Sequence, residues 1–485
     1  MEDHPHLPLC VDLDGTLIKT DLLIESIVIF LKQSPWKGFY LLLWLFRGKS
    51  YLKYQLSIHV VLRPDLLPYH QDVLELIKTR RMQGGKAFLC SASNESVVEQ
   101  VAQYLGVFNG VYGSSKTLNV KAKVKADQLV KTFGEKKFDY VGNEACDYEV
   151  FKKAQHAFFV TDSRSKERKI AVKGIVFEKV FYLNHHVKMY IKLLRVHHWA
   201  KNVLVFLPIL LSHQITNPVL FGKAFLSFIL ISLLASGTYV LNDILDLDAD
   251  RSHRIKKNRP LAIGAISLVK GAAIACLLTL LSGLGGFFFA PKILIFLVSY
   301  FVVTVSYSLW CKKIVMLDVL ILAFLHTVRI IMGAVVIGET VSEWLFSFSI
   351  FLFCSLGFVK RYSEIYHKER SAISQENTQV PGRGYIYGDL YVIQMLGIGL
   401  GGCSILIFVL YISSETVKNL YQVNYWLWLV APVLLYWLGR LWILTSRGEV
   451  NEDPILFSIK DKMNYALLAI IIVCLLLANY GVNVL

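Results

Sequence analysis

The sequence predicts two domains of different class, an α/β domain followed by an all-α membrane domain. Of the 485 residues, 55% are hydrophobic, which is more than an ordinary soluble chain of this length carries. The excess is uneven, because the first part mixes charged and apolar residues, whereas apolar runs of membrane-spanning length recur from about residue 203. We therefore expect one domain over residues 1–185 and another over residues 186–485.

Strands that alternate with helices predict a Rossmann-like parallel sheet in the first domain. "LPLCVDLDGTL" (7–17), "GGKAFLCSAS" (84–93) and "KFDYVGNEACD" (137–147) each place an apolar run before small or polar residues. Residues 95–106 and 124–134 have helical apolar spacing and end at glycine. This order favours a parallel sheet whose loops gather at the carboxyl ends of its strands.

An insertion over residues 20–83 interrupts this pattern. It is rich in Leu, Trp and Tyr and includes "GFYLLLWLF" (38–46), which is too short to span a bilayer. The run is therefore either part of a helical cap packed on the sheet or a surface that touches the membrane. We favour the helical cap.

The second domain contains about nine apolar runs, which predict nine transmembrane helices. They lie near 203–212, 220–241, 266–289, 293–310, 316–337, 344–359, 391–413, 425–444 and 465–484. The loops 243–265, 311–315, 360–390 and 445–463 carry most of the Lys and Arg, so they are expected on the cytoplasmic side of the cell inner membrane. This multi-pass topology places the first domain in the cytoplasm and, with an odd number of spans, the C-terminus outside.

The charge and the cysteines limit the partners. The net charge of +15 suggests anionic partners, and the positive-inside bias of a membrane protein explains much of it. We expect membrane lipids and phosphorylated substrates rather than nucleic acid as partners, and a homo-oligomer is left open. The eight cysteines form no C-x-x-C pair, so neither a disulfide framework nor a zinc site is expected.

"VDLDGT" (11–16) supplies two carboxylates, Asp12 and Asp14, at a predicted strand end. One carboxylate can attack phosphorus while the other moves a proton, with Mg²⁺ screening the charge. Further along the chain, Ser91 can donate to a phosphoryl oxygen, Lys125 can neutralise the attacking carboxylate, and Asp147 can complete the magnesium site. Alone, D-x-D-G is also compatible with a simple turn.

In these motifs, residues 7–175 resemble the haloacid dehalogenase (HAD) superfamily of phosphohydrolases. The resemblance implies a phosphoaspartyl mechanism with Asp12 as nucleophile and Asp14 as general acid and base. Asn143 stands where many members have another aspartate, and Lys121 and Lys123 compete with Lys125 for the lysine role. We favour Lys125, because its position in the helix fits the family. The alternative is a non-catalytic domain that serves as a scaffold.

A second acidic motif lies in "YVLNDILDLDADRSHRIKKNRPLA" (239–262), between two apolar runs. If the helix continues through it, each residue advances about 100°, which places Asn242, Asp243, Asp246 and Asp250 on one face and Asp248 on the opposite side. Carboxylates that share a face repel one another unless a divalent cation lies between them, and oxygen ligands favour Mg²⁺. The alternative is a solvated loop whose acids pair with the basic residues that follow, Arg251, Arg254, Lys256, Lys257 and Arg259.

This motif and the nine spans resemble the UbiA superfamily of intramembrane prenyltransferases, in which the magnesium carries a diphosphate leaving group. Most members have a second aspartate motif, whereas "FVKRYSEIYHKER" (358–370) contains no aspartate. This segment, together with residues 193–208, 307–334 and 448–461, resembles the branch that includes decaprenyl-phosphate phosphoribosyltransferase. That branch uses phosphoribosyl diphosphate as donor and a polyprenyl phosphate as acceptor.

The resemblance implies transfer of 5-phosphoribose to the lipid phosphate, which attacks the anomeric carbon as pyrophosphate leaves. One magnesium ion plus several cations would neutralise the donor. The residues expected to bind substrate are Lys201, Asn202, Lys256, Arg259, Tyr307, Lys312, Arg329, Lys360, Arg361 and Glu364. The HAD-like domain could then remove the 5-phosphate of the lipid product. Alternatives are a prenyltransferase that uses prenyl diphosphate and an aromatic or other acceptor, a transporter, and a lipid-binding protein without turnover.

Overall fold

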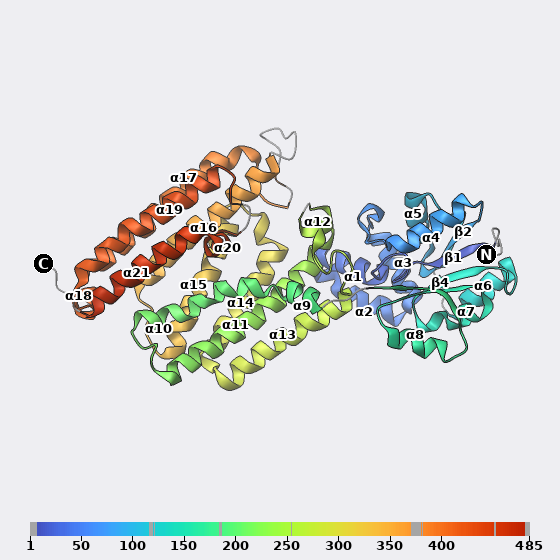
Figure 1. The fold of residues 1–485 in the computed structure, drawn as a ribbon, viewed down its shortest axis with the longest axis horizontal. Helices are drawn as coiled ribbons and strands as arrows, with labels where there is room; N and C mark the ends of the chain where they lie inside the picture. Colours follow the sequence, from blue (N-terminus) through green and yellow to red (C-terminus); the bar gives the residue numbers. More distant parts are fainter. Residues whose placement is uncertain are drawn as a thin grey trace. The chain divides into compact units, whose positions relative to one another are not determined.

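Two units make up the fold, which is known from a computed structural model (Figure 1). The described residues are 7–115, 120, 122–183, 187–253, 255–369, 380, 382–450 and 453–480. Unit 1 combines Met1–Leu194 with Tyr239–Cys276, and unit 2 combines Arg195–Thr238 with Leu277–Leu485. The segment with the second acidic motif therefore belongs to the same unit as the N-terminal domain. The expected domain boundary at residues 185 and 186 stays a prediction.

A six-stranded, all-parallel sheet forms the core of unit 1, in the order β3-β2-β1-β4-β5-β6. The strands are β1 (Leu9–Asp12), β2 (Ala87–Asn94), β3 (Gly110–Ser114), β4 (Asp139–Gly142), β5 (Ala157–Thr161) and β6 (Phe177–Tyr182). The helices between them are α5 (Glu95–Leu105), α6 (Lys123–Phe133), α7 (Tyr148–Lys153) and α8 (Arg164–Ala171). The expected α/β class is confirmed, and β1, β2 and β4 coincide with the three strands expected from the sequence.

Local sequence explains why these elements form. All four residues of β1 are buried, which suits an uninterrupted apolar run in the middle of a parallel sheet. Helix α5 begins after Asn94, whose side chain accepts a hydrogen bond from the Ser96 N–H, and ends at Gly106 in the left-handed conformation. Because β1 is central, the loop that follows it lies where the ends of β2 and β4 meet.

The insertion between β1 and β2 is helical. It contains α1 (Leu22–Gln33), η1 (Pro35–Gly38), α2 (Phe39–Phe46), α3 (Lys49–His59), η2 (Pro64–Leu66) and α4 (Gln71–Met82). Phe30 of α1 and Leu52 and Leu56 of α3 form a small core, against which Leu41 and Trp44 of α2 pack. No residue of α2 is buried. The expected packing of residues 38–46 on the sheet is thus replaced by a partial packing against α1 and α3.

Eight helices among the described residues are long and apolar enough to cross a membrane. They comprise α11 (Pro218–Leu245), α13 (Leu268–Phe289), α14 (Pro291–Leu309), α15 (Leu317–Ile337), α16 (Glu343–Glu369), α17 (Leu390–Ile412) with the 3₁₀ turn before it, α19 (Val430–Ser446) with the 3₁₀ helix before it, and α21 (Lys462–Tyr480). The first of the nine expected spans, 203–212, instead lies in η4 (Val196–Phe206) and α10 (Leu207–Leu211), which together are shorter. The outside C-terminus expected from an odd number of spans stays a prediction.

Short elements connect these helices. They are η3 (Ala145–Asp147), α9 (Val187–Leu194), α12 (Leu247–Ser252), η5 (Lys256–Asn258), η6 (Cys311–Lys313), η7 (Tyr387–Asp389), α18 (Glu415–Leu420), η8 (Asn424–Leu429) and α20 (Pro454–Lys460). Within unit 1, Leu193, Ile244 and Leu247 share an apolar cluster against which Ile24 and Val28 of α1 pack. This cluster joins the second acidic motif to the insertion.

Candidate active sites

The first candidate site lies at the carboxyl ends of β1, β2 and β4. We call it the carboxylate site, and it contains Asp12, Asp14, Ser91, Lys125 and Asp147. Asp12 ends β1, and Gly15 follows with φ of 71°, a conformation that glycine adopts without strain. Lys125 lies in α6, and Asp147 ends η3, directly after β4. The structure therefore brings together all five residues that the sequence suggested for a phosphoryl-transfer site.

Lys125 lies between two of the carboxylates. Its Nζ is 2.7 Å from Asp12 Oδ1 and 3.6 Å from Asp147 Oδ1, and all three side chains are largely buried. Tyr140 adds a hydroxyl that donates to Asp147 Oδ1 at 3.0 Å. Burial lowers the pKa of Lys125, but the two carboxylates outweigh it and the net pKa is raised. The raised pKa favours the cationic form of Lys125 beside Asp12.

Asp14 is held by a different set of donors. Its Oδ1 accepts from the Leu22 N–H at 2.8 Å, at the start of α1. Its Oδ2 accepts from the hydroxyls of Ser91 at 3.0 Å and Ser93 at 2.7 Å. Ser93 was not expected from the sequence, although its position two residues after Ser91 in a strand predicts the same side of the sheet. Asp14 is thus oriented by the insertion and by the end of β2.

The carboxylate site contains oxygen ligands of the kind that a magnesium ion prefers. Asp12 and Asp147 converge on one cationic nitrogen, and carboxylate oxygens are ligands that Mg²⁺ prefers. In addition, Asn143 Oδ1 is a buried oxygen that has no hydrogen-bond partner. Burial raises the pKa of Asp12, and the ammonium of Lys125 opposes that change. A bound cation would complement this group of oxygens.

The second candidate site is the aspartate segment, which we define as residues 239–262. Arg259 Nη1 lies 3.0 Å from Asp243 Oδ1 and 2.5 Å from Asp250 Oδ2, so the two carboxylates converge on one point. Burial raises the pKa of Asp250 to about 6, while the cation of Arg259 opposes the increase. These two carboxylates are oxygen ligands of the kind that a divalent metal prefers. No group of three His, Cys, Asp or Glu residues in the described ranges could hold a metal ion.

The other members of this segment differ in their partners. Helix α11 ends at Leu245, and Asp246 opens α12 with φ of −99° and ψ of 18°. Asp246 Oδ1 accepts from Lys32 of α1 at 3.1 Å. Asn242 lies in the last turn of α11, and Asp248 lies in α12. The Asp246 N–H still donates to the Asn242 carbonyl at 2.9 Å and the Asp250 N–H to the Asp246 carbonyl at 2.8 Å, so the shared face of Asp243, Asp246 and Asp250 stays a prediction.

An ion pair that the sequence did not predict fixes the aspartate segment. Arg251 donates to both carboxylate oxygens of Glu25 in α1, at 2.7 and 2.9 Å, and to the Ala262 carbonyl at 3.1 Å. Both side chains of the Arg251–Glu25 pair are buried. Because the two residues are more than 200 positions apart, sequence spacing alone gave no signal for this contact. Of the other basic residues of this segment, Lys256 lies in η5 and Arg254 lies outside the described residues. Lys121, an alternative to Lys125 at the carboxylate site, also lies outside them.

Unit 2 contains a buried network centred on Arg361 of α16. Its Nε lies 2.6 Å from Asp318 Oδ2, its Nη1 contacts Glu364, and its Nη2 donates to the Tyr307 hydroxyl at 3.0 Å. Arg383 donates to the same hydroxyl at 3.2 Å, and Tyr385 donates to Asp318 Oδ1 at 2.8 Å. Asp318, Arg383 and Tyr385 were not candidates from the sequence. Asp318 does carry a signal, because an acid inside an apolar span normally has a partner.

The other expected cations of unit 2 form two further groups. Lys201 Nζ lies 2.5 Å from Asp453 Oδ2, and Lys360 Nζ lies 3.5 Å from the same oxygen. Arg329 donates to Asn202 Oδ1 at 2.7 Å and to the Tyr300 hydroxyl at 3.0 Å. Lys312 lies in η6. Burial favours a neutral Asp453, yet Lys201 and Lys360 overcome it and lower the pKa of that carboxyl.

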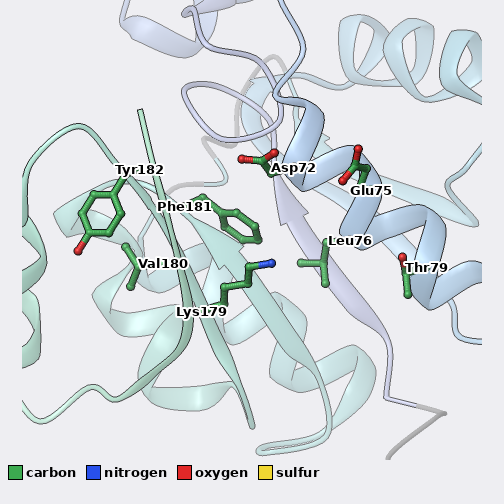
Figure 2. Close-up of a pocket in the computed structure, with 8 residues that line it drawn as sticks. All are labelled: Asp72, Glu75, Leu76, Thr79, Lys179, Val180, Phe181 and Tyr182. Carbon is green, nitrogen blue, oxygen red and sulfur yellow. The ribbon is translucent and has the colours of Figure 1, made fainter. Parts of the chain in front are cut away.

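A shallow cavity of about 420 Å³ opens between α4 and β6 of unit 1. Figure 2 shows its lining residues, among them Asp72 and Glu75 from α4 and Lys179 from β6. None of the residues expected to be functional lines it. We therefore assign it no part in catalysis.

Comparisons with known proteins concern both units. The model of the UbiA prenyltransferase family matches residues 203–468. The uncharacterized protein y4nM of Sinorhizobium fredii is 35% identical over 472 residues, covering 96% of this chain and 90% of that protein. Decaprenyl-phosphate phosphoribosyltransferase of Mycobacterium tuberculosis is 28% identical over 187 residues, covering 37% of this chain and 61% of that protein. A solved UbiA homolog from Archaeoglobus fulgidus bound to GPP and Mg²⁺ is 16% identical with a TM-score of 0.43, covering 60% of this chain and 98% of that one.

Proposed function

The chain belongs to the UbiA prenyltransferase family, and we propose that it transfers 5-phosphoribose from phosphoribosyl diphosphate to a polyprenyl phosphate at the cytoplasmic membrane face. The family and the eight apolar helices among the described residues indicate an integral membrane protein, which has direct access to a lipid acceptor. The phosphoribosyltransferase relative matches 37% of the chain and suggests the donor and the acceptor. Transferase activity of the UbiA family is thus the coarse function, and the donor and the acceptor are the proposal.

The observation that carries the proposal is the turn of α16 with Lys360, Arg361 and Glu364. Residues 358–369 contain no aspartate, and the carboxylate of Glu364 at this turn already contacts Arg361. Cations and the Tyr307 hydroxyl are found at this turn instead. Cations can neutralise a densely anionic sugar donor directly, through charge-assisted hydrogen bonds to its phosphates.

The proposed reaction needs little proton transfer. The acceptor phosphate is already ionised, so its oxygen can attack the anomeric carbon of the ribose without a general base. Asp243 and Asp250 would hold a magnesium ion, which neutralises the charge of the departing pyrophosphate. Arg259 keeps these two carboxylates together when they carry no metal. Lys360 and Arg383 would bind phosphate oxygens, and Tyr307 would donate a hydrogen bond to the donor.

Membranes that contain the protein should convert labelled phosphoribosyl diphosphate and polyprenyl phosphate into an extractable labelled lipid. Asp243→Asn and Asp250→Asn should each abolish this transfer, whereas Lys292→Met, which changes an exposed cation at the start of α14, should leave it intact. Label transfer from a prenyl diphosphate, with none from phosphoribosyl diphosphate, would refute the proposed donor and favour a prenyltransferase.

For the carboxylate site we propose a phosphatase that removes the 5-phosphate from the lipid-linked product. Asp12 would attack phosphorus, Asp14 would protonate the leaving alkoxide and then activate water, and Ser91 and Lys125 would bind the phosphoryl oxygens. The arrangement of Lys125 on Asp12, with Asp14 held by Ser91 and Ser93, supports this order of roles.

Labelled lipid phosphoribose given to the purified protein should release inorganic phosphate. An Asp12→Asn variant should retain phosphoribosyl transfer and accumulate the phosphorylated lipid. Phosphate release that is unaffected by this substitution would exclude the carboxylate site as its source.

A further inference from the structure

Helix α2 carries an exposed apolar surface in a part of the chain that contributes no span. Its sequence is FYLLLWLF, and Phe39, Leu42 and Phe46 are 54%, 62% and 88% exposed. Leu43 and Leu45 are also exposed, as is Trp36 in the preceding turn. Large apolar residues grouped in this way on a soluble surface mark a contact with a partner or with a membrane.

The exposure is not a sign that α2 is unpacked. Leu41 and Trp44 lie one turn apart and pack against α1 and α3, and the rings of Trp44 and Phe30 are 5.2 Å apart. The small core thus fixes which side of α2 faces outward. Apart from Tyr40, whose ring stacks on Trp44 with centroids 6.0 Å apart, the remaining side chains of α2 are apolar and exposed.

The length of α2 excludes a transmembrane role. Eight residues of α-helix extend about 12 Å, whereas the hydrocarbon core of a bilayer is about 30 Å thick. A short helix with an apolar outer face and aromatic side chains suits the boundary between headgroups and acyl chains, where it lies in the plane of the membrane.

The charges around α2 indicate which partner its exposed surface contacts. Residues 26–64 contain six Lys or Arg residues and no Asp or Glu. Lys37 precedes the helix, and Arg47 and Lys49 follow it, all three exposed. Long basic side chains at both ends can keep their charges at headgroup level while their stems cover apolar surface. Such a set is complementary to anionic phospholipid and would repel a basic protein surface.

We propose that α2 is an interfacial helix that inserts its outer face into the headgroup region of an anionic bilayer. This inference goes beyond the proposed catalytic functions and depends only on the chain being a membrane protein. By holding the insertion at the lipid surface, α2 would keep the carboxylate site, whose Asp14 is bonded to the start of α1, within reach of lipid-borne phosphate.

Photo-crosslinking of the full-length protein tests this contact. Phe46→p-benzoylphenylalanine should crosslink to phospholipid in vesicles of phosphatidylcholine and phosphatidylglycerol in equal amounts. Val176, before β6 in the same unit, is also 88% exposed, and the same substitution there should give at most a few per cent of that yield. Crosslinks from position 46 only to protein, whether within the chain or to a second copy, would overturn the proposal.

The charge dependence gives an independent readout. Lys37→Glu combined with Arg47→Glu should lower the lipid crosslink yield at position 46 several-fold, and so should vesicles of phosphatidylcholine alone. An unchanged yield in both experiments would overturn the role of anionic lipid. Neither result depends on phosphoribosyl transfer or on phosphatase activity, so the failure of those functions would be seen separately.

Discussion

The individual cations of unit 2 differ in how completely the protein itself neutralises them. Arg361 contacts two carboxylates and a tyrosine and is essentially fully buried. Lys360 shares Asp453 with Lys201 at a longer distance, and about a third of its side chain is exposed. A buried cation with matched acids holds structure, whereas an exposed cation at the edge of such a network can still accept an anionic ligand. Substitution of Arg361 should therefore lower stability, whereas substitution of Lys360 should weaken ligand binding.

Arg361→Met should destabilise the protein strongly. It leaves Asp318 and Glu364 without their main cation, and breaking a buried pair typically costs about 3–5 kcal/mol. Arg440→Met removes a cation from the more exposed pair with Asp461 and should cost at most about 1 kcal/mol. Thermal unfolding in detergent compares the two variants. Equal shifts would show that the Arg361 network contributes little stability.

Lys360→Met should instead change substrate binding. A charge-assisted hydrogen bond contributes about 1.5–3 kcal/mol, which corresponds to roughly a ten- to hundredfold increase in KM for the donor. The melting temperature should stay close to that of the unchanged protein. A large fall in melting temperature with an unchanged KM would assign Lys360 a structural role.

At the scale of elements, α1 connects both acidic sites of unit 1. Its first N–H donates to Asp14, its Glu25 holds Arg251, and its Lys32 contacts Asp246. Asp250, next to Arg251 in α12, faces Asp243 through Arg259. The position of the aspartate segment therefore depends on a helix that belongs to the insertion of the N-terminal domain.

Reversal of the Glu25–Arg251 pair tests this dependence. Arg251→Glu places two buried acids together and should lower both stability, by about 3–5 kcal/mol, and the rate of lipid transfer. Glu25→Arg combined with Arg251→Glu restores opposite charges and should recover a large part of both. Recovery of stability without any recovery of transfer would argue against a positioning role. Activity that no variant affects would exclude the pair from the proposed reaction.

At the scale of the molecule, local patterns predicted the classes of element but not their partners. The apolar run before Asp12 and the glycine at residue 106 specify their strand and helix through neighbouring residues only. Pattern also predicted that Asp12, Lys125 and Asp147 would meet, because parallel strands end at one edge of the sheet. It could not predict the Glu25–Arg251 pair, which depends on how distant segments pack. The first expected span lies in the apolar helix Val196–Leu211, whose first eleven residues form a 3₁₀ helix, and its crossing of the membrane stays a prediction.

The composition of unit 1 from two separate stretches of chain leads to a prediction about the whole molecule. Residues 239–276 run from the end of α11 to the start of α13, yet they pack against the N-terminal domain through the Glu25–Arg251 pair and an apolar cluster with Ile24 and Val28. A protease site inserted after Leu183 should therefore sever the chain without releasing the N-terminal domain.

After cleavage in mild detergent, which removes any contribution from lipid, both fragments should elute together in size-exclusion chromatography. The same insertion combined with Glu25→Arg places like charges at the contact and should release the N-terminal fragment. Complete release of the N-terminal fragment without Glu25→Arg would show that only the covalent connection holds the two stretches together. It would also contradict the dependence of the aspartate segment on α1.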